Sequence, residues 1–203
     1  MDNKKLRGQL RALAKKDRDV AAGLELVGYP ETRVRPEGLE TLLSIIVGQQ
    51  ISTAAASAVM ARVRALLPSV DPGALLALPG DALRNAGLSN RKVEYSIGLA
   101  RAIESGELPL ESFRELDDES VVEQITALRG LGRWSAEIYL MFSLQRGDIF
   151  PADDLALQLA LQKLKRMRAR PTPRKARENI SHWAPYRSAG SLFLWHYYRG
   201  APT

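Results

Sequence analysis

Residues 127–161 read ALRGLGRWSAEIYLMFSLQRGDIFPADDLALQLAL, and in this stretch a Leu-Arg-Gly-Leu-Gly turn separates two helical patterns. Gly130 and Gly132 can take positive φ angles, and they carry no side chain that would block an approaching ligand. The helix expected from Arg133 presents backbone N–H groups without an internal partner, so the turn and Arg133 together favour phosphate binding. An ordinary helix–helix turn with a glycine cap would have the same sequence, so the choice between the two interpretations depends on the surrounding segments.

Composition and charge favour a globular protein with a polyanionic partner. The 203 residues are 45% hydrophobic and 26% charged, with a formal net charge of +6. No acidic residue lies between Leu155 and Arg177. The basic residues of that block are Lys163, Lys165, Arg166, Arg168, Arg170, Arg174, Lys175 and Arg177. Such a one-sign block fits either a solvated loop or a surface that faces phosphates.

Several classes of site are excluded by residue counts. The chain has no cysteine, which excludes disulfides, thiolate zinc sites and iron–sulfur clusters. Its two histidines are too few for a histidine metal site unless carboxylates complete the set.

The longest apolar runs fall far short of the ~20 residues that cross a bilayer, and the charged N-terminus has no apolar signal core. We therefore expect a cytoplasmic protein that does not contact membranes.

Helical periodicity dominates the chain, and no alternating strand pattern or internal repeat is present. Apolar spacing predicts one surface helix over 4–24, and Pro171 and Pro173 are expected to interrupt the helical pattern after Met167. Further helices are expected over 39–47, 53–67, 73–78, 80–88, 90–105, 119–128, 133–144, from Asp153/Asp154 to Met167, and over 186–198. The predicted fold class is all-α.

Four separated segments together resemble the helix-hairpin-helix DNA glycosylase superfamily, and more narrowly the 3-methyladenine DNA glycosylase II family. They are IIVGQQIS at 45–52, LRNAGLSNRKVEYSIGLA at 83–100, LRGLGRWSAEIYLMF…IFPADD at 128–154, and WAPYRSAGSLFLW at 183–195. The resemblance implies two helical lobes with a DNA-binding, active-site cleft between them. Residues 38–146 would form the lobe that ends in the helix-hairpin-helix, and residues 1–37 with 147–203 would form the lobe that carries the catalytic aspartate.

The resemblance assigns catalysis to Asp154. Asp153 and Asp154 precede a helical pattern, so an N-cap role accounts for one of them. Breaking an N-glycosidic bond builds positive charge on the deoxyribose, which a fixed carboxylate stabilises, and the same group could orient or deprotonate the attacking water. Bifunctional relatives have a lysine two residues after the second hairpin glycine, where this chain has Trp134. We therefore expect a simple hydrolase without lyase activity.

The remaining site residues also follow from the resemblance. Trp134 and Trp195 would be pocket walls that attract cationic alkylated purines, although core packing is the usual role of tryptophan. The target base must leave the duplex, and Gln49 would border the pocket that receives it. Gln50 or Ile51 would fill the gap that the base leaves, and Gln50 departs from the family pattern. The hairpin residues expected to bind DNA are Gly130, Leu131, Gly132 and Arg133.

Two positions depart from the pocket composition of some relatives. Ile138 and Leu155 occupy sites where those relatives have tyrosines, which makes the expected pocket less aromatic. The resemblance also implies a monovalent cation, Na⁺ or K⁺, bound by the backbone carbonyls of Thr126, Leu128 and Leu131. It would serve DNA binding, and no cofactor is expected to be required for the chemistry.

The function expected is excision of alkylated purines, especially 3-methyladenine, from double-stranded DNA by a monomeric, monofunctional glycosylase that starts base-excision repair. Two alternatives remain. A related glycosylase could prefer ethenoadenine, hypoxanthine or uracil, because a methyl group changes selectivity by only ~1–3 kcal/mol. The chain could also be a DNA-binding hairpin protein without catalysis.

Overall fold

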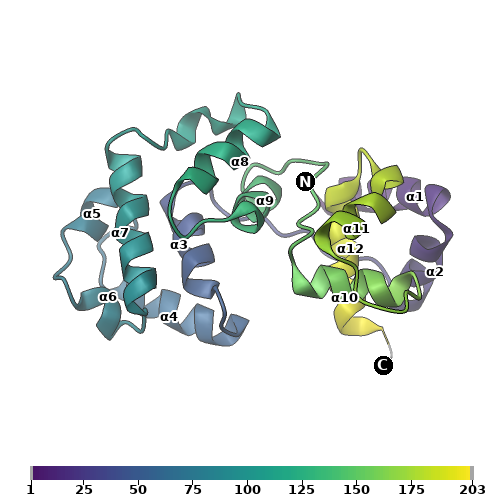
Figure 1. Cartoon of the computed structure of the whole chain (residues 1–203), viewed down its shortest axis with the longest axis horizontal. Coiled ribbons are helices and arrows are strands. Elements are labelled where there is room, and N and C mark those ends of the chain that lie inside the picture. The colour runs from purple at the N-terminus through teal and green to yellow at the C-terminus, as the bar shows by residue number, and fades with distance from the viewer. Residues whose placement is uncertain (1, 202–203) are drawn as a thin grey trace. The chain divides into compact units, whose positions relative to one another are not determined.

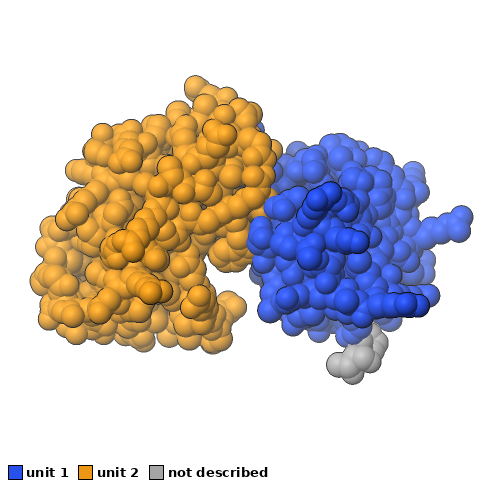
Figure 2. Space-filling view, viewed as in Figure 1, with its two compact units in different colours: residues 1–34, 140–203 blue, residues 35–139 orange. Residues whose placement is uncertain are grey.

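All regular elements are helical in the computed structural model, which describes residues 2–201 (Figure 1). The all-α class predicted from the sequence is therefore confirmed. Contacts divide the chain into two compact units, residues 1–34 with 140–203 as unit 1 and residues 35–139 as unit 2 (Figure 2). None of the helices described is long and apolar enough to span a lipid bilayer.

Unit 2 is built from short helices around one long helix, α7. Its elements are α3 (Leu39–Gly48), α4 (Thr53–Ala65), α5 (Pro72–Leu76), α6 (Ala82–Asn85), α7 (Asn90–Glu104), the 3-10 helix η1 (Leu110–Arg114), α8 (Asp118–Ala127) and most of α9 (Arg133–Phe142). A polar side chain begins four of them: those of Ser52, Asp71, Ser89 and Asp117 accept a backbone N–H of the first turn. These caps explain why helices of only one to four turns start where they do.

The core of unit 2 gathers on α3. The helix is apolar on nearly every face and packs against both α4 and α7, so it is buried as such a composition requires. The ring of Tyr139 meets Phe113 edge to face at 6.1 Å, and its hydroxyl accepts the backbone N–H of Gly38 at 2.9 Å. The buried tyrosine thereby satisfies its polar end while it fixes the start of α3.

Unit 1 joins the N-terminal helices to the last third of the chain. Its elements are α1 (Asn3–Lys16), α2 (Arg18–Val27), α10 (Leu155–Leu164), α11 (Pro173–Asn179), the 3-10 helix η2 (Ser181–Trp183) and α12 (Arg187–Gly200). Helix α12 packs against α1, α2 and α10. Two glycines permit this close packing, because a Cβ at Gly190 would lie 2.4 Å from the Trp183 ring and one at Gly23 would lie 2.6 Å from the Phe193 ring.

The single helix predicted over 4–24 is wrong, since the chain breaks at Asp17 into α1 and α2. Asp17 is only 4% exposed, and its carboxylate caps α2 by accepting the N–H groups of Asp19 and Val20. Lys165 and Trp183 also donate to this carboxylate, each at 2.7 Å. These tertiary partners make the break favourable, and they cannot be read from apolar spacing within the segment.

The helical pattern does resume after Met167, because Pro173 begins helix α11. Proline is tolerated in the first turn of a helix, where its missing N–H has no partner to lose. The Thr172 hydroxyl accepts the N–H of Lys175 and completes the cap. The interruption predicted at this proline is therefore confined to the residues before it.

Candidate functional site

The hairpin turn of residues 128–132 joins α8 to α9, and its two glycines have different structural roles. Gly130 has φ +93°, and a Cβ there would lie 2.3 Å from the ring of Tyr95 on α7. Gly132 is exposed, has no such φ, and a Cβ there would meet nothing within 4 Å. The fold thus requires the first glycine, whereas the second leaves open space in front of the turn.

The second glycine also starts α9. Its carbonyl accepts the N–H groups of Ser135 at 2.9 Å and of Ala136 at 3.2 Å. Leu131 beside it is buried and holds the turn by donating its N–H to the Leu128 carbonyl at 3.2 Å. An exposed glycine at a helix start combines accessible backbone N–H groups with the positive end of the helix dipole, which is the arrangement that binds phosphate.

Arg133, at the start of α9, forms ion pairs within unit 2. Its guanidinium bonds the carboxylate of Glu119 on α8 and that of Glu137 one turn along α9, the latter at 3.2 Å. The hydrogen bond that Arg133 donates to Glu119 is the main cause that raises the pKa of Arg133. A phosphate contact by this side chain would have to compete with two carboxylates.

The loop between α3 and α4 carries the residues expected to enter DNA. Gln50 is exposed with φ +59°, and Ile51 is an apolar side chain that is 41% exposed. Gln49 is half-buried and donates its side-chain amide to the Gly130 carbonyl at 2.8 Å. The amide therefore has an internal partner, and it ties this loop directly to the hairpin turn.

Lys92, on α7, holds the same loop from its other side. Its ammonium donates to the carbonyls of Val47 and Gln49, both at 2.7 Å. These carbonyls lie at the end of α3, where a cation is favoured by the helix dipole. Burial lowers the pKa of Lys92. Both of these contacts are structural.

Asp154 is the N-cap of α10, and a tryptophan shares its carboxylate. Oδ1 accepts the backbone N–H of Leu157 at 3.0 Å and the indole N–H of Trp195 at 3.1 Å. The cap role and the predicted catalytic role therefore fall on the same aspartate. Asp153 lies 3.7 Å from the guanidinium of Arg177 and is not the cap.

The surroundings of Asp154 are fixed by neighbouring contacts of unit 1. The Trp195 indole packs against the Phe142 ring at 5.6 Å with a 32° tilt. The buried amide of Gln158 donates to the Ala152 carbonyl at 2.7 Å and holds the chain before the cap. Leu155, directly after Asp154, is 54% exposed. The carboxylate thus lies at the N–H edge of the Trp195 indole and directly before an exposed apolar side chain in the chain.

A second anchor lies at the start of α12. Arg187 donates to Asp148 from its backbone N–H, from Nε and from Nη2, at 3.1, 2.8 and 2.6 Å. Because Asp148 lies in the segment between α9 and α10, this bidentate pair secures the connection that leads to Asp154.

The predicted site residues fall in both units. Asp154 and Trp195 belong to unit 1 and are in direct contact, whereas Gln49 and Gly130 belong to unit 2 and are likewise bonded to each other. The remaining candidates of unit 2 are Gln50, Ile51, Thr126, Leu128, Leu131, Gly132, Arg133 and Trp134. Trp134 is half-buried at the second position of α9.

Sequence reasoning missed Tyr95, Arg33 and Arg199. Tyr95 on α7 contacts Gly130 in the hairpin turn, and these residues are distant in sequence. The glycine itself was the one sequence signal that a close neighbour lies at this position. Arg33 and Arg199 line a pocket of unit 1 together with Trp195. No local pattern in the sequence connects these two arginines.

No group of three or more His, Asp or Glu side chains in residues 2–201 could hold a metal ion. The backbone carbonyls of Thr126, Leu128 and Leu131 are a different kind of site. Thr126 lies in the last turn of α8, where helix carbonyls have no intrahelical donor. The Leu128 carbonyl already accepts one N–H, but a carbonyl oxygen has two lone pairs and keeps one of them.

The similarity to known proteins covers the residues described above. A family profile described as HhH-GPD superfamily base excision DNA repair protein matches residues 43–185. The chain is 31% identical to DNA-3-methyladenine glycosylase 1 of Schizosaccharomyces pombe over 165 residues, which are 79% of this chain and 72% of that protein. It spans 43% and 59% of the length of two further curated relatives.

Two solved structures are similar along nearly the whole chain. One is a 3-methyladenine DNA glycosylase of S. pombe in complex with abasic DNA, with a TM-score of 0.86, 29% identity, and coverage of 93% of this chain and 95% of that one. The other is a DNA-3-methyladenine glycosidase of Bacillus halodurans, with a TM-score of 0.82, 31% identity, and coverage of 94% and 89%.

Proposed function

We propose that this chain, which belongs to the HhH-GPD superfamily of base excision DNA repair proteins, is a monofunctional DNA glycosylase. It hydrolyses the N-glycosidic bond of alkylated purines, 3-methyladenine and related bases, in double-stranded DNA and so starts base-excision repair. The relatives whose names carry this activity support the substrate class. The observation that carries the proposal is the carboxylate of Asp154, held by two hydrogen-bond donors.

Asp154 would act on the sugar. As the bond to the base breaks, positive charge develops on the deoxyribose, and a carboxylate already fixed in position stabilises it without reorganising. The Leu157 and Trp195 donors support such a fixed geometry. The same carboxylate would orient the attacking water and take up its proton, while the base leaves with the bonding electron pair.

Aromatic and apolar side chains would receive the base. A base within a duplex must first be extruded, and an alkylated purine nucleotide carries positive charge that aromatic faces attract. We propose Trp195 and Trp134 as such faces, with Gln49 at the edge of the pocket. The contact of Trp195 with Asp154 supports its place beside the reacting sugar.

The loop of residues 49–51 and the hairpin would bind the duplex. We propose that Gln50 or Ile51 fills the space left by the extruded nucleotide, which the exposure of both side chains supports. The open turn at Gly132 supports a phosphate contact through the backbone N–H groups near Arg133, with Gly130 and Leu131 shaping the turn. The Gln49–Gly130 hydrogen bond would hold these two DNA-binding elements together.

Water rather than an amine would attack the sugar. The position where bifunctional relatives have a lysine carries Trp134, so no Schiff base can form from the side chain there. We therefore propose that an intact abasic site is the product.

Na⁺ or K⁺ on the carbonyls of Thr126, Leu128 and Leu131 would support DNA binding, and no cofactor is required. Action as a monomer and location in the cytoplasm stay predictions.

The test is product analysis on defined duplexes. Methylated double-stranded DNA is incubated with the protein, and released bases are separated by chromatography beside ethenoadenine, hypoxanthine and uracil substrates. We expect free 3-methyladenine, abasic DNA that breaks only after alkali, and no covalent complex after borohydride reduction. Release of another base alone would replace the substrate class, and DNA binding without any release would overturn the enzymatic proposal.

A further inference from the structure

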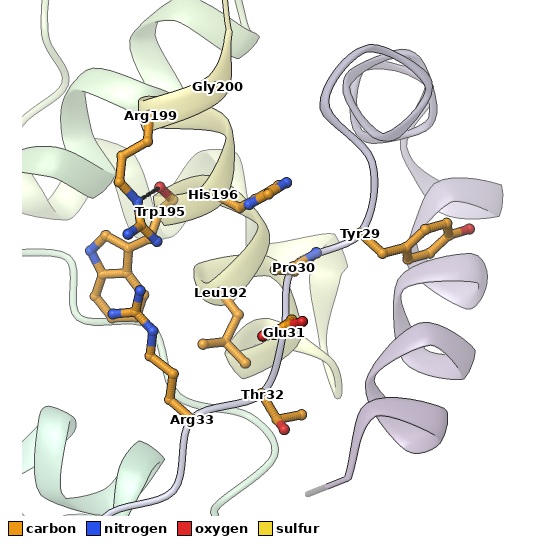
Figure 3. Close-up of a pocket in the computed structure, with 10 residues that line it drawn as sticks. All are labelled: Tyr29, Pro30, Glu31, Thr32, Arg33, Leu192, Trp195, His196, Arg199 and Gly200. Carbon is orange, nitrogen blue, oxygen red and sulfur yellow. Dashed lines mark hydrogen bonds between the residues drawn. The ribbon is translucent and has the colours of Figure 1, made fainter.

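Unit 1 contains a pocket of about 620 Å³ whose lining includes Trp195. The segment of residues 29–33 forms one side, and α12 forms the other with Leu192, Trp195, His196, Arg199 and Gly200. Figure 3 shows the side chains of Arg33 and Arg199 reaching from opposite sides towards the Trp195 indole. The pocket thus places two guanidinium groups beside the tryptophan that contacts Asp154.

The two guanidinium groups have no carboxylate partner in residues 2–201. Arg199 donates Nε to the Trp195 carbonyl at 3.3 Å. Of the other ionisable lining residues, Glu31 is exposed, as Arg33 and Arg199 also are, and forms no ion pair with either. The Tyr29 ring lies 5.9 Å from the guanidinium of Arg7, and the His196 ring donates to the Val27 carbonyl at 2.7 Å. Burial, and then the charge of Arg199, lower the pKa of Arg33. Two like charges in one pocket favour an anion between them.

We propose that Arg33 and Arg199 bind a backbone phosphate of the DNA, beside the nucleotide whose sugar faces Asp154. The identification of the anion as DNA rests on the proposed function. The pocket itself is defined by geometry and charge, and these favour an anion. The planar fork of arginine matches the oxygens of a phosphate, which can bond both nitrogens of one guanidinium.

The same charges exclude the alternative that this pocket holds the damaged base. A 3- or 7-alkylated purine nucleotide is cationic, and two arginines beside the Trp195 ring would repel it. A phosphodiester carries the opposite charge and gains from both side chains. The base is therefore expected to meet another surface of Trp195, while the side chains of Arg33 and Arg199 contact the strand.

Trp195 connects the phosphate site to the carboxylate. Its indole N–H bonds Asp154 at 3.1 Å, and its carbonyl accepts from Arg199. A phosphate bound between the two arginines would leave the Trp195–Asp154 contact in place and add a fixed point on the strand. Arg33 and Arg199 would be binding and positioning residues, since neither contacts Asp154.

The test measures binding of a duplex that contains a tetrahydrofuran abasic analogue, by fluorescence anisotropy over a range of NaCl concentrations. Because each phosphate contact contributes about 0.9 to the slope of log Kd against log salt, Arg33→Gln/Arg199→Gln should lower the slope by about 0.9. The matched control is Arg11→Gln/Lys15→Gln, which removes two exposed charges from α1 of the same unit. Its slope should equal that of the wild type, and thermal melting checks that both variants fold.

Three results would overturn the proposal. They are an unchanged slope in the pocket variant, an equal loss in the control variant, and an unchanged DNA slope combined with calorimetric binding of inorganic phosphate that the pocket variant loses. The last result would assign the pocket to free phosphate instead of DNA. Because the abasic analogue needs no base release, failure of the glycosylase activity would be seen separately in the product assay.

Discussion

Trp195 donates its indole N–H to Oδ1 of Asp154 at 3.1 Å, and the same oxygen accepts the backbone N–H of Leu157 at 3.0 Å. One donor comes from the first turn of α10 and the other from α12, which packs against α10. The position of the carboxylate is therefore set by two helices at once. Activity should depend on the indole N–H as well as on the aromatic ring.

Replacing the tryptophan by phenylalanine separates these two contributions. Trp195→Phe keeps an aromatic face but removes one donor to a carboxylate, a hydrogen bond of the class worth about 1.5–3 kcal/mol. We expect the single-turnover rate of base release to fall at least ~10-fold, since 1.4 kcal/mol corresponds to a factor of ten. The Kd for an abasic-analogue duplex should change far less. A rate equal to that of the wild type would show that the ring alone matters.

The hairpin glycines offer a matched pair of substitutions. Gly130→Ala places a Cβ against the Tyr95 ring at a positive φ, and the backbone strain alone costs about 1–3 kcal/mol. We expect a lowered melting temperature. Gly132→Ala meets nothing within 4 Å and should melt like the wild type, yet bind duplex DNA more weakly because its methyl group blocks the phosphate. Equal DNA binding by Gly132→Ala and the wild type would argue against a phosphate at this turn.

Lys92 should stabilise the fold without contacting DNA. Lys92→Met leaves the carbonyls of Val47 and Gln49 without their ammonium donor, which we expect to lower the free energy of unfolding by about 1–3 kcal/mol. Because these partners are carbonyls, the slope of log Kd against log salt should match that of Arg91→Gln, an exposed neighbour on α7. A slope lower by about 0.9 in Lys92→Met alone would instead identify a phosphate contact.

Asp17 gives the stability of the protein an acid-dependent component. Burial alone would raise the pKa of Asp17, but hydrogen bonds from Lys165, Trp183 and His182 outweigh it and lower the pKa from 3.8 to about 2. A depressed folded-state pKa stabilises the fold above pH 3.8, and this contribution is lost as the pH falls towards 2. The shift corresponds to about 2 kcal/mol.

Urea unfolding of the wild type and Asp17→Asn at several pH values tests this component. The variant should be less stable at pH 7, and the difference between the two proteins should narrow between pH 4 and pH 2. A difference that stays constant over this range would mean that the charge of Asp17 does not contribute. Asp2→Asn, at the exposed cap of α1, is the control.

The fold class and the hairpin could be predicted because their signals are local. Apolar spacing, capping residues and the two glycines each act within a few positions, and so does the cap that Asp154 provides for α10. The break at Asp17 could not be predicted, because the partners that make it favourable, Lys165 and Trp183, are distant in sequence. The Arg33–Arg199 pocket could not be predicted either, because its two arginines are also distant in sequence.

The residue that sequence reasoning named for catalysis is also the cap of α10, and this coincidence affects how substitutions must be designed. Asparagine can still accept the Leu157 N–H, since it is a good N-cap residue. Asp154→Asn therefore removes the charge while the helix cap is kept, whereas alanine would remove both. Asp153→Asn is the matched control, because this neighbouring carboxylate is exposed and neither caps the helix nor contacts Trp195.

The single-turnover rate of 3-methyladenine release from methylated duplex DNA, for the wild type, Asp154→Asn and Asp153→Asn, tests the central claim most directly. We expect release by the wild type and by Asp153→Asn at similar rates. We expect a loss of about 10²-fold or more in Asp154→Asn, as for removal of a group that stabilises transition-state charge. Release by Asp154→Asn within a few-fold of the wild type, or loss in Asp153→Asn alone, would contradict the claim.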